Sequence, residues 1–101
     1  MNVSTKCQDR NLELCLKGEL DHHGAQGVLK KIEVSIEQYL PTVLILDFSG
    51  VTFMDSSGIA VVLRGWQRMK AMEGSVILRN VAPQPKKVFA AARINTMVTM
   101  E

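Results

Sequence analysis

The sequence has only two cysteines, no apolar run long enough to span a bilayer, and no block of like charges. Two cysteines without histidines at ligand spacing are too few for a zinc site. Lysines and arginines are spread along the chain at a net charge of +2, so charge gives nucleic-acid binding no support. The first residues do not lead into a signal-peptide apolar region. These absences predict a cytoplasmic protein with no membrane span, no metal and no direct contact with nucleic acid.

Nucleotide and redox motifs are missing as well. The chain contains no G-x-x-x-x-G-K phosphate loop, no G-x-G-x-x-G fingerprint and no C-x-x-C pair, so we expect no bound cofactor. Cys7 and Cys15 are predicted to lie on neighbouring strands. This placement is compatible with a disulfide between them, although a reducing compartment favours two buried thiols.

What the sequence does contain is the composition of a globular α/β domain. Of its 101 residues, 47% are hydrophobic and 22% are charged, which is enough to bury a core without disulfides. Residues 1–101 are therefore predicted to form one domain. Apolar residues recur with the period of a strand in some segments and of a helix in others.

Those two periods, with the Gly and Pro positions, predict eight elements. They are strands at 3–7 and 12–16, a helix at 25–40, a strand at 43–46, a helix at 57–72, a strand at 75–79, a helix at 86–93 and an edge strand at 96–100. The apolar run at 43–46 is typical of a strand buried on both faces. The order β-β-α-β-α-β-α-β predicts a mixed, mostly parallel sheet with helices packed on it.

Residues 53–58, here called the serine turn, connect that strand to the start of a long helix. Asp55, Ser56 and Ser57 stand where helix-capping residues are found. A helix N-terminus carries free N–H groups and partial positive charge, so it suits a phosphate or another anion. On local chemistry alone, capping is the simpler role, and a phosphorylation switch on a serine is the functional alternative.

Residues 18–23, here called the histidine loop, follow a strand in the same way, and Asp21 or His22 can cap the next helix. The carboxyl ends of parallel strands meet at one edge of a sheet, where ligands and partners bind. We therefore expect the histidine loop beside the serine turn. His22 and His23 are adjacent and project in different directions, so they make a poor metal-binding pair.

Two other kinds of site are less favoured. A serine between strand and helix is similar to a hydrolase elbow, but the glycine required two residues earlier is lacking, since Met54 and Asp55 stand there. Asp47, at the end of a buried strand, is similar to the phosphoacceptor of a receiver domain. Receivers also need an acidic pair after their first strand, and this chain offers only Asp9 there.

Three motifs taken together resemble the bacterial anti-sigma factor antagonists, which are single STAS domains. The motifs are G-E-L-D-H-H at 18–23, L-I-L-D-F at 44–48 and F-M-D-S-S-G-I at 53–59. Residues 83–89 are also similar to the segment before the family's third helix. The resemblance covers nearly the whole chain and implies a STAS fold.

The resemblance implies a regulator of transcription that does not touch DNA and is not an enzyme. In this family the unphosphorylated antagonist binds an anti-sigma factor that is also a serine kinase, and this frees the sigma factor. Phosphorylation of the serine directly after the aspartate, here Ser56, switches the binding off, and a PP2C-type phosphatase restores it. The partner-binding residues implied are Asp21, His22, His23, Asp55, Ser57, Gly58, Ile59, Ala60 and Val61.

Two features depart from the family pattern. Residues 92–94 read Ala-Arg-Ile where many relatives have Ser-Gly-Leu, and the chain ends at Glu101 where the family usually continues into a C-terminal helix. We therefore expect a short or absent final helix, with Met97 and Met100 exposed and a tendency to form a homodimer. The alternative functions are a STAS scaffold subunit of a lipid-transport or stressosome-like assembly, in which Ser56 only caps the helix, and a weak nucleotide-binding module.

Overall fold

Five strands form one mixed sheet in the computed structural model, which describes residues 1–101. The strands are β1 (Asn2–Gln8), β2 (Asn11–Lys17), β3 (Val43–Gly50), β4 (Ser75–Arg79) and β5 (Thr99–Met100). They lie in sequence order across the sheet, with β1 antiparallel to β2 and all other neighbours parallel. The predicted opening hairpin and mostly parallel sheet are confirmed.

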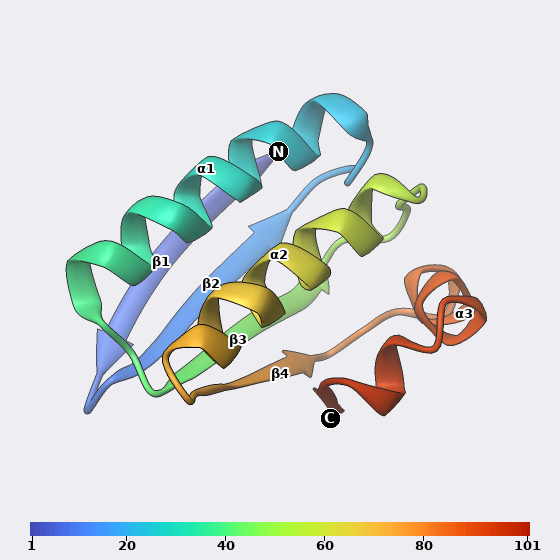
Figure 1. The fold of residues 1–101 in the computed structure, drawn as a ribbon. Helices are drawn as coiled ribbons and strands as arrows, with labels where there is room; N and C mark the ends of the chain where they lie inside the picture. The colour runs from blue at the N-terminus through green and yellow to red at the C-terminus, as the bar shows by residue number, and fades with distance from the viewer.

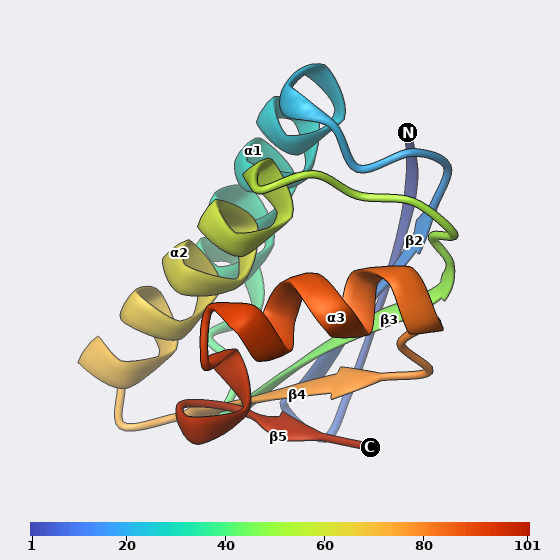
Figure 2. The same cartoon turned by 90° about the vertical axis from the view of Figure 1, so that its right-hand side faces the viewer.

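Three helices cover one face of this sheet (Figures 1 and 2). They are α1 (His22–Tyr39), α2 (Ser57–Ala71) and α3 (Pro83–Ala91), and a short 3₁₀ turn, Ile94–Thr96, precedes β5. Helix α3 begins three residues before the predicted start at 86, because a helix accepts proline in its first turn. None of the three helices has the length and apolar character needed to cross a bilayer.

The core lies between the helices and the facing side of the sheet. Strand residues at alternate positions point toward the helices and are buried, as the period-two pattern predicts; they are Leu12, Leu14, Leu16, Leu44, Leu46, Phe48, Val76 and Leu78. The rings of Phe48 and Phe89 meet edge-on with their centroids 5.3 Å apart. This contact packs α3 onto β3.

The opposite face of the sheet carries no helix, so the prediction that the strand at 43–46 is buried on both faces is wrong. Ile45 and Ile77 are half-buried there. Glu13 pairs with Arg79 at 3.7 Å, and Arg79 pairs with Glu101 at 3.0 Å. Charged side chains thus cover this face in place of helices.

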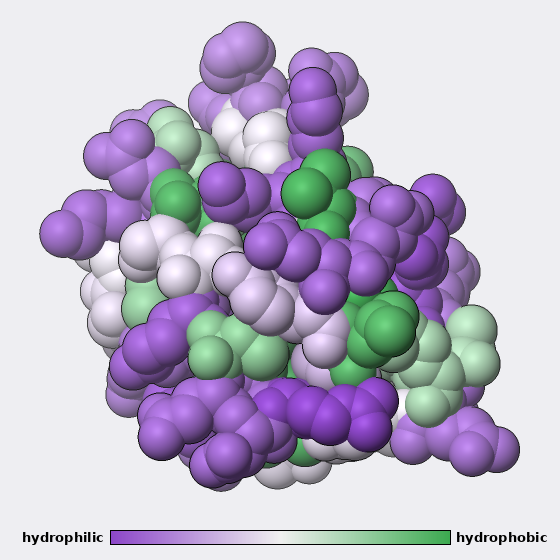
Figure 3. Space-filling view, turned by 90° about the vertical axis from the view of Figure 1, so that its left-hand side faces the viewer, coloured by the Kyte–Doolittle hydropathy of each residue, from purple (hydrophilic) through white to green (hydrophobic).

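The remaining local predictions are partly corrected. Cys7 and Cys15 are free and half-buried rather than buried, and in the β1–β2 register neither faces the other, which leaves no cross-strand disulfide. Met97 is 37% exposed as expected, whereas Met100 is half-buried against the core. Figure 3 views the molecule from the left-hand side of Figure 1, where small hydrophobic areas are separated by hydrophilic ones. Self-association stays a prediction.

The end of α3 is strained because Arg93 adopts the left-handed conformation, with φ +58°. Glycine has no Cβ to clash there, so Arg93→Gly should stabilise the protein by about 0.5–1 kcal/mol after its greater freedom in the unfolded chain is subtracted. Chemical unfolding followed by Trp66 fluorescence measures the change. Ala92→Gly is the matched control: its φ is −92°, so glycine there should only destabilise. A loss in both variants would contradict the assignment of strain.

Candidate functional site

The serine turn and the histidine loop lie side by side at the carboxyl ends of β2 and β3, as the parallel topology predicts (Figure 1). Leu20 and Met54 form an isolated parallel bridge between them. The N–H of Leu20 donates to the carbonyl of Phe53 at 3.1 Å, and the N–H of Asp55 donates to the carbonyl of Leu20 at 3.3 Å. These backbone bonds hold the two segments together immediately before α1 and α2 begin.

Ser56 stands at the N-terminus of α2 with an exposed side chain and no hydrogen bond on its hydroxyl. Asp55 supplies the cap: its Oδ1 accepts the N–H of Ser57 at 2.8 Å, and its carbonyl accepts the N–H of Gly58 at 3.1 Å. The capping interpretation is therefore right for Asp55 and wrong for Ser56. The hydroxyl of Ser56 is accessible and makes no hydrogen bond within the fold.

The charge beside that hydroxyl is negative. Hydrogen bonds from the backbone and side chain of Ser57 hold the pKa of Asp55 below its usual value, and the charge of His22 acts in the same direction. Asp55 is consequently ionised at neutral pH. A phosphate on Ser56 would be near this carboxylate, which repels it, and near the N-terminus of α2, which attracts it.

Asp21 is the N-cap of α1, and like Asp55 it accepts a backbone N–H of the first helical turn. Its Oδ1 accepts the N–H of Gly24 at 2.8 Å, and its carbonyl accepts the N–H of Ala25 at 2.8 Å. Helix α1 therefore begins at His22, which confirms the predicted cap at Asp21 and extends the helix three residues before the apolar pattern that starts at 25. His22 and His23 occupy its exposed first turn, so they lie on the surface next to the serine turn.

Comparison with known proteins identifies the family. The family model of the STAS domain matches residues 2–101. This chain belongs to the STAS domain family. The STAS domain is 42% identical over 74 residues to an anti-sigma F factor antagonist of Lysinibacillus sphaericus, and the match covers 73% of this chain and 63% of that protein. An anti-sigma F factor antagonist of Paenibacillus polymyxa is 31% identical over 68 residues, covering 67% and 58%. The chain thus spans less than two thirds of the length of these relatives.

Solved structures of the anti-sigma factor antagonist SpoIIAA have the same fold. Its unphosphorylated form aligns with a TM-score of 0.86 at 32% identity, covering 99% of this chain and 88% of that one. Its phosphorylated form, described as a Bacillus cell fate determinant, aligns with a TM-score of 0.77 at 31% identity, covering 99% and 91%. The resemblance inferred from the sequence motifs is confirmed for family and fold.

Two of the residues expected to bind a partner are sealed inside the STAS domain, which corrects those assignments. Val61 has no exposed surface. Gly58 is buried, and a Cβ on it would lie 2.6 Å from the sulfur of Met54. Gly58 is structural because its missing side chain lets α2 pack closely against Met54 and Leu20. Val61 is structural because it belongs to the buried core. Ile59 is half-exposed and Ala60 is exposed, so these two remain available to a partner.

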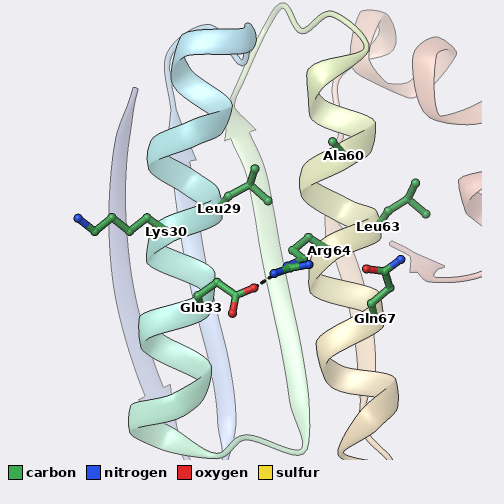
Figure 4. Close-up of a pocket in the computed structure, with 7 residues that line it drawn as sticks. All are labelled: Leu29, Lys30, Glu33, Ala60, Leu63, Arg64 and Gln67. Carbon is green, nitrogen blue, oxygen red and sulfur yellow. Dashed lines mark hydrogen bonds and ion pairs between the residues drawn. The ribbon is translucent and has the colours of Figure 1, made fainter.

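The accessible part of α2 lies between two shallow hollows. Ala60 lines a groove between α1 and α2, which Arg64 crosses by donating from Nε to Glu33 Oε1 at 2.6 Å (Figure 4). Ile59 lines a second, mostly apolar hollow with residues of α3 and with the residue that follows it; these are Lys87, Val88, Ala91 and Ala92. A partner that covers Ser56 would therefore meet apolar surface on either side of the helix.

The receiver-like interpretation of Asp47 is wrong. Asp47 lies toward the carboxyl end of β3, whereas Asp9 lies in the turn before β2, at the other end of the sheet. Partial burial raises the pKa of Asp47, but hydrogen bonds from Ser49 and Asn80 and the charge of Arg79 outweigh it and leave the pKa below its usual value. Asp47 therefore belongs to the charged network on the helix-free face of the sheet.

That face also contains a cluster of metal-ligating residue types. Glu13, Cys15 and Asp47 each place one ligand atom within 4.8 Å of the others. The guanidinium of Arg79 lies 3.7 Å from Glu13 and also lowers the pKa of Asp47. Because a cation is already present beside both carboxylates, the cluster is explained as part of an ion-pair network.

One side chain at the site carries no signal in the sequence. Gln84, in the first turn of α3, donates from Nε2 to the carbonyl of Met54 and accepts the Met54 N–H on Oε1, both at 2.9 Å. It is 30 residues from Met54 along the chain and lies between two prolines. Only the folded arrangement brings it to the serine turn.

The division of roles between Asp55 and Ser56 predicts different costs of substitution. Asp55→Ala removes the cap of α2 and should destabilise the protein by about 1 kcal/mol. Ser56→Ala removes a hydroxyl without a partner and should change stability by less than about 0.5 kcal/mol. Chemical unfolding at neutral pH measures both. A loss for Ser56→Ala as large as that for Asp55→Ala would mean that the serine caps the helix after all.

Proposed function

We propose that this STAS domain is an anti-sigma factor antagonist controlled by phosphorylation of Ser56. The unphosphorylated form binds an anti-sigma factor that is itself a serine kinase, and this releases the sigma factor. The proposal is carried by the exposed, unbonded hydroxyl of Ser56 at the N-terminus of α2. It is supported by the relatives named anti-sigma factor antagonists and by the phosphorylated and unphosphorylated forms of SpoIIAA.

The local geometry gives the switch a physical basis. Backbone bonds to Leu20 and the cap from Asp55 hold the serine turn, and none of them uses the Ser56 hydroxyl. Phosphorylation therefore breaks no hydrogen bond of the fold, but it adds about two negative charges next to ionised Asp55. The surface around Ser56 becomes more negative and gains volume while the backbone stays in place.

The proposed binding surface surrounds the serine. His22 and His23 lie on one side of it, and Ile59 and Ala60 continue along α2. Asp21 and Asp55 act mainly through the helix N-termini that they cap, and Ser57 acts through its hydrogen bonds to Asp55. All three are partly exposed and so can also contact a partner. In this proposal the chain is a kinase substrate in the cytoplasm rather than an enzyme, and a PP2C-type phosphatase returns it to the binding form.

The first test is whether the cognate kinase phosphorylates Ser56 and no other serine. The protein is incubated with the cognate kinase, ATP and magnesium, and the modified residue is located by mass spectrometry. We expect one phosphate on Ser56, because its hydroxyl is exposed and free of hydrogen bonds. Ser57→Ala should still be modified, and Ser56→Ala should not. Phosphate that persists in Ser56→Ala, or that is found only on Ser57, would contradict the proposal.

Charge at the same position should disrupt binding. Ser56→Asp is expected to weaken the complex with the anti-sigma factor at least tenfold, a loss of about 1.4 kcal/mol in binding free energy. Titration calorimetry measures it, and circular dichroism checks that the fold is intact. Ser4→Asp makes the same charge change at an exposed serine of β1 and should leave the affinity unchanged. Equal affinities for Ser56→Asp and the unaltered protein would favour the scaffold alternative.

A further inference from the structure

A single glutamine side chain pairs with the backbone of the serine turn. Oε1 of Gln84 accepts the N–H of Met54, and Nε2 donates to the carbonyl of the same residue, both at 2.9 Å. The two ends of one amide thus satisfy both polar backbone groups of one residue, as a neighbouring strand would. Met54 is buried and lies two residues before Ser56.

The backbone on the other side of the same segment is also paired. Leu20 donates to the carbonyl of Phe53 at 3.1 Å and accepts the N–H of Asp55 at 3.3 Å. Residues 53–55 are therefore held on two edges, by the histidine loop on one side and by Gln84 on the other. Ser56 follows directly, so its position depends on both attachments.

Gln84 itself is fixed by the packing of α3. Pro83 and Pro85 flank it and restrict the backbone on either side. Further along the helix, Phe89 is fully buried and meets Phe48 of β3 edge-on. Figure 2 shows α3 lying across the sheet below the connector between β3 and α2, so the start of the helix can reach that connector.

We infer that Gln84 is a positioning residue whose amide couples the docking of α3 to the conformation in which Ser56 is presented. The inference rests on the proposed role of Ser56 as phosphoacceptor. Both hydrogen bonds end on Met54, so a displacement of either α3 or the turn breaks them together. Gln84 acts through Met54 and Asp55 and does not itself touch the phosphorylated oxygen.

Amide hydrogen exchange tests the coupling without any partner protein. Gln84→Met keeps the length of the side chain and removes both hydrogen bonds, whereas Gln84→Glu keeps the acceptor and loses the donor. We expect exchange of the Met54 N–H to accelerate on the order of tenfold in Gln84→Met and less in Gln84→Glu. Exchange at Leu44 and Leu46 in β3 should not change.

The matched control is Gln38→Met, the same substitution at an exposed position of α1. It should leave Met54 exchange as in the unaltered protein. Unchanged Met54 exchange in Gln84→Met would overturn the inference. Equal acceleration at Met54, Leu44 and Leu46 would also overturn it, because Gln84 would then contribute only to global stability.

Steady-state phosphorylation by the cognate kinase tests the functional consequence. If the two hydrogen bonds from Gln84 to Met54 maintain the conformation in which Ser56 is presented, their loss lowers the fraction of protein that the kinase can bind. KM then rises by the inverse of that fraction. We expect Gln84→Met to raise KM roughly three- to tenfold at nearly unchanged kcat, Gln84→Glu to raise it less, and Gln38→Met to leave it unchanged. A purely structural role in a protein that stays folded would not produce this KM-against-kcat split.

The two proposals fail in different ways. If the unaltered protein acquires no phosphate on Ser56, the proposed function fails, and the exchange at Met54 still decides whether Gln84 holds the turn. If Ser56 is phosphorylated and Gln84→Met has the KM of the unaltered protein, the positioning role is overturned and the proposed function stands.

Discussion

The backbone bridge between Leu20 and Met54 is the interaction on which the site depends. It joins the segment that leads into α1 to the segment that leads into α2, at the carboxyl ends of two parallel strands. Because both helices begin immediately after the bridge, their N-termini open on the same edge of the sheet. Backbone groups alone make this pairing. The side chains that follow it, at the starts of α1 and α2, are therefore not required to hold the two segments together.

The two helices begin with the same division between a capping side chain and an exposed one. At each start an aspartate accepts a backbone N–H of the first turn, Asp21 for α1 and Asp55 for α2. The side chains next to these caps, His22 and Ser56, are exposed, and neither caps a helix. A site that can change its charge without changing its backbone follows from this separation between capping and exposed residues.

Much of this arrangement can be predicted from the sequence. Alternating residues define the opening hairpin, helical spacing defines α1 and α2, and parallel topology places the histidine loop beside the serine turn. The bounds are less predictable, because tertiary pairing extends some elements. β3, for example, continues past Asp47 to Gly50, since Asp47 pairs with Arg79 of β4 and Lys17 of β2 pairs with Gly50.

Other features could not be predicted, for identifiable physical reasons. Asp55 and Ser56 are both good caps, and only the backbone conformation decides that the aspartate reaches the N–H of Ser57. The burial of Gly58 depends on how closely α2 approaches Met54, which no local pattern encodes. Gln84 reads as an ordinary polar residue of a short helix, because its partner is 30 residues away.

The central claim is that phosphate on Ser56 makes the local surface strongly negative and leaves the fold of the domain unchanged. The most direct measurement is the affinity of one preparation for the anti-sigma factor kinase before phosphorylation, after it, and after treatment with a phosphatase. The account predicts that binding is lost with the phosphate and fully regained when the phosphate is removed. Equal affinity in the phosphorylated and unphosphorylated forms, or a loss that dephosphorylation does not reverse, would contradict it.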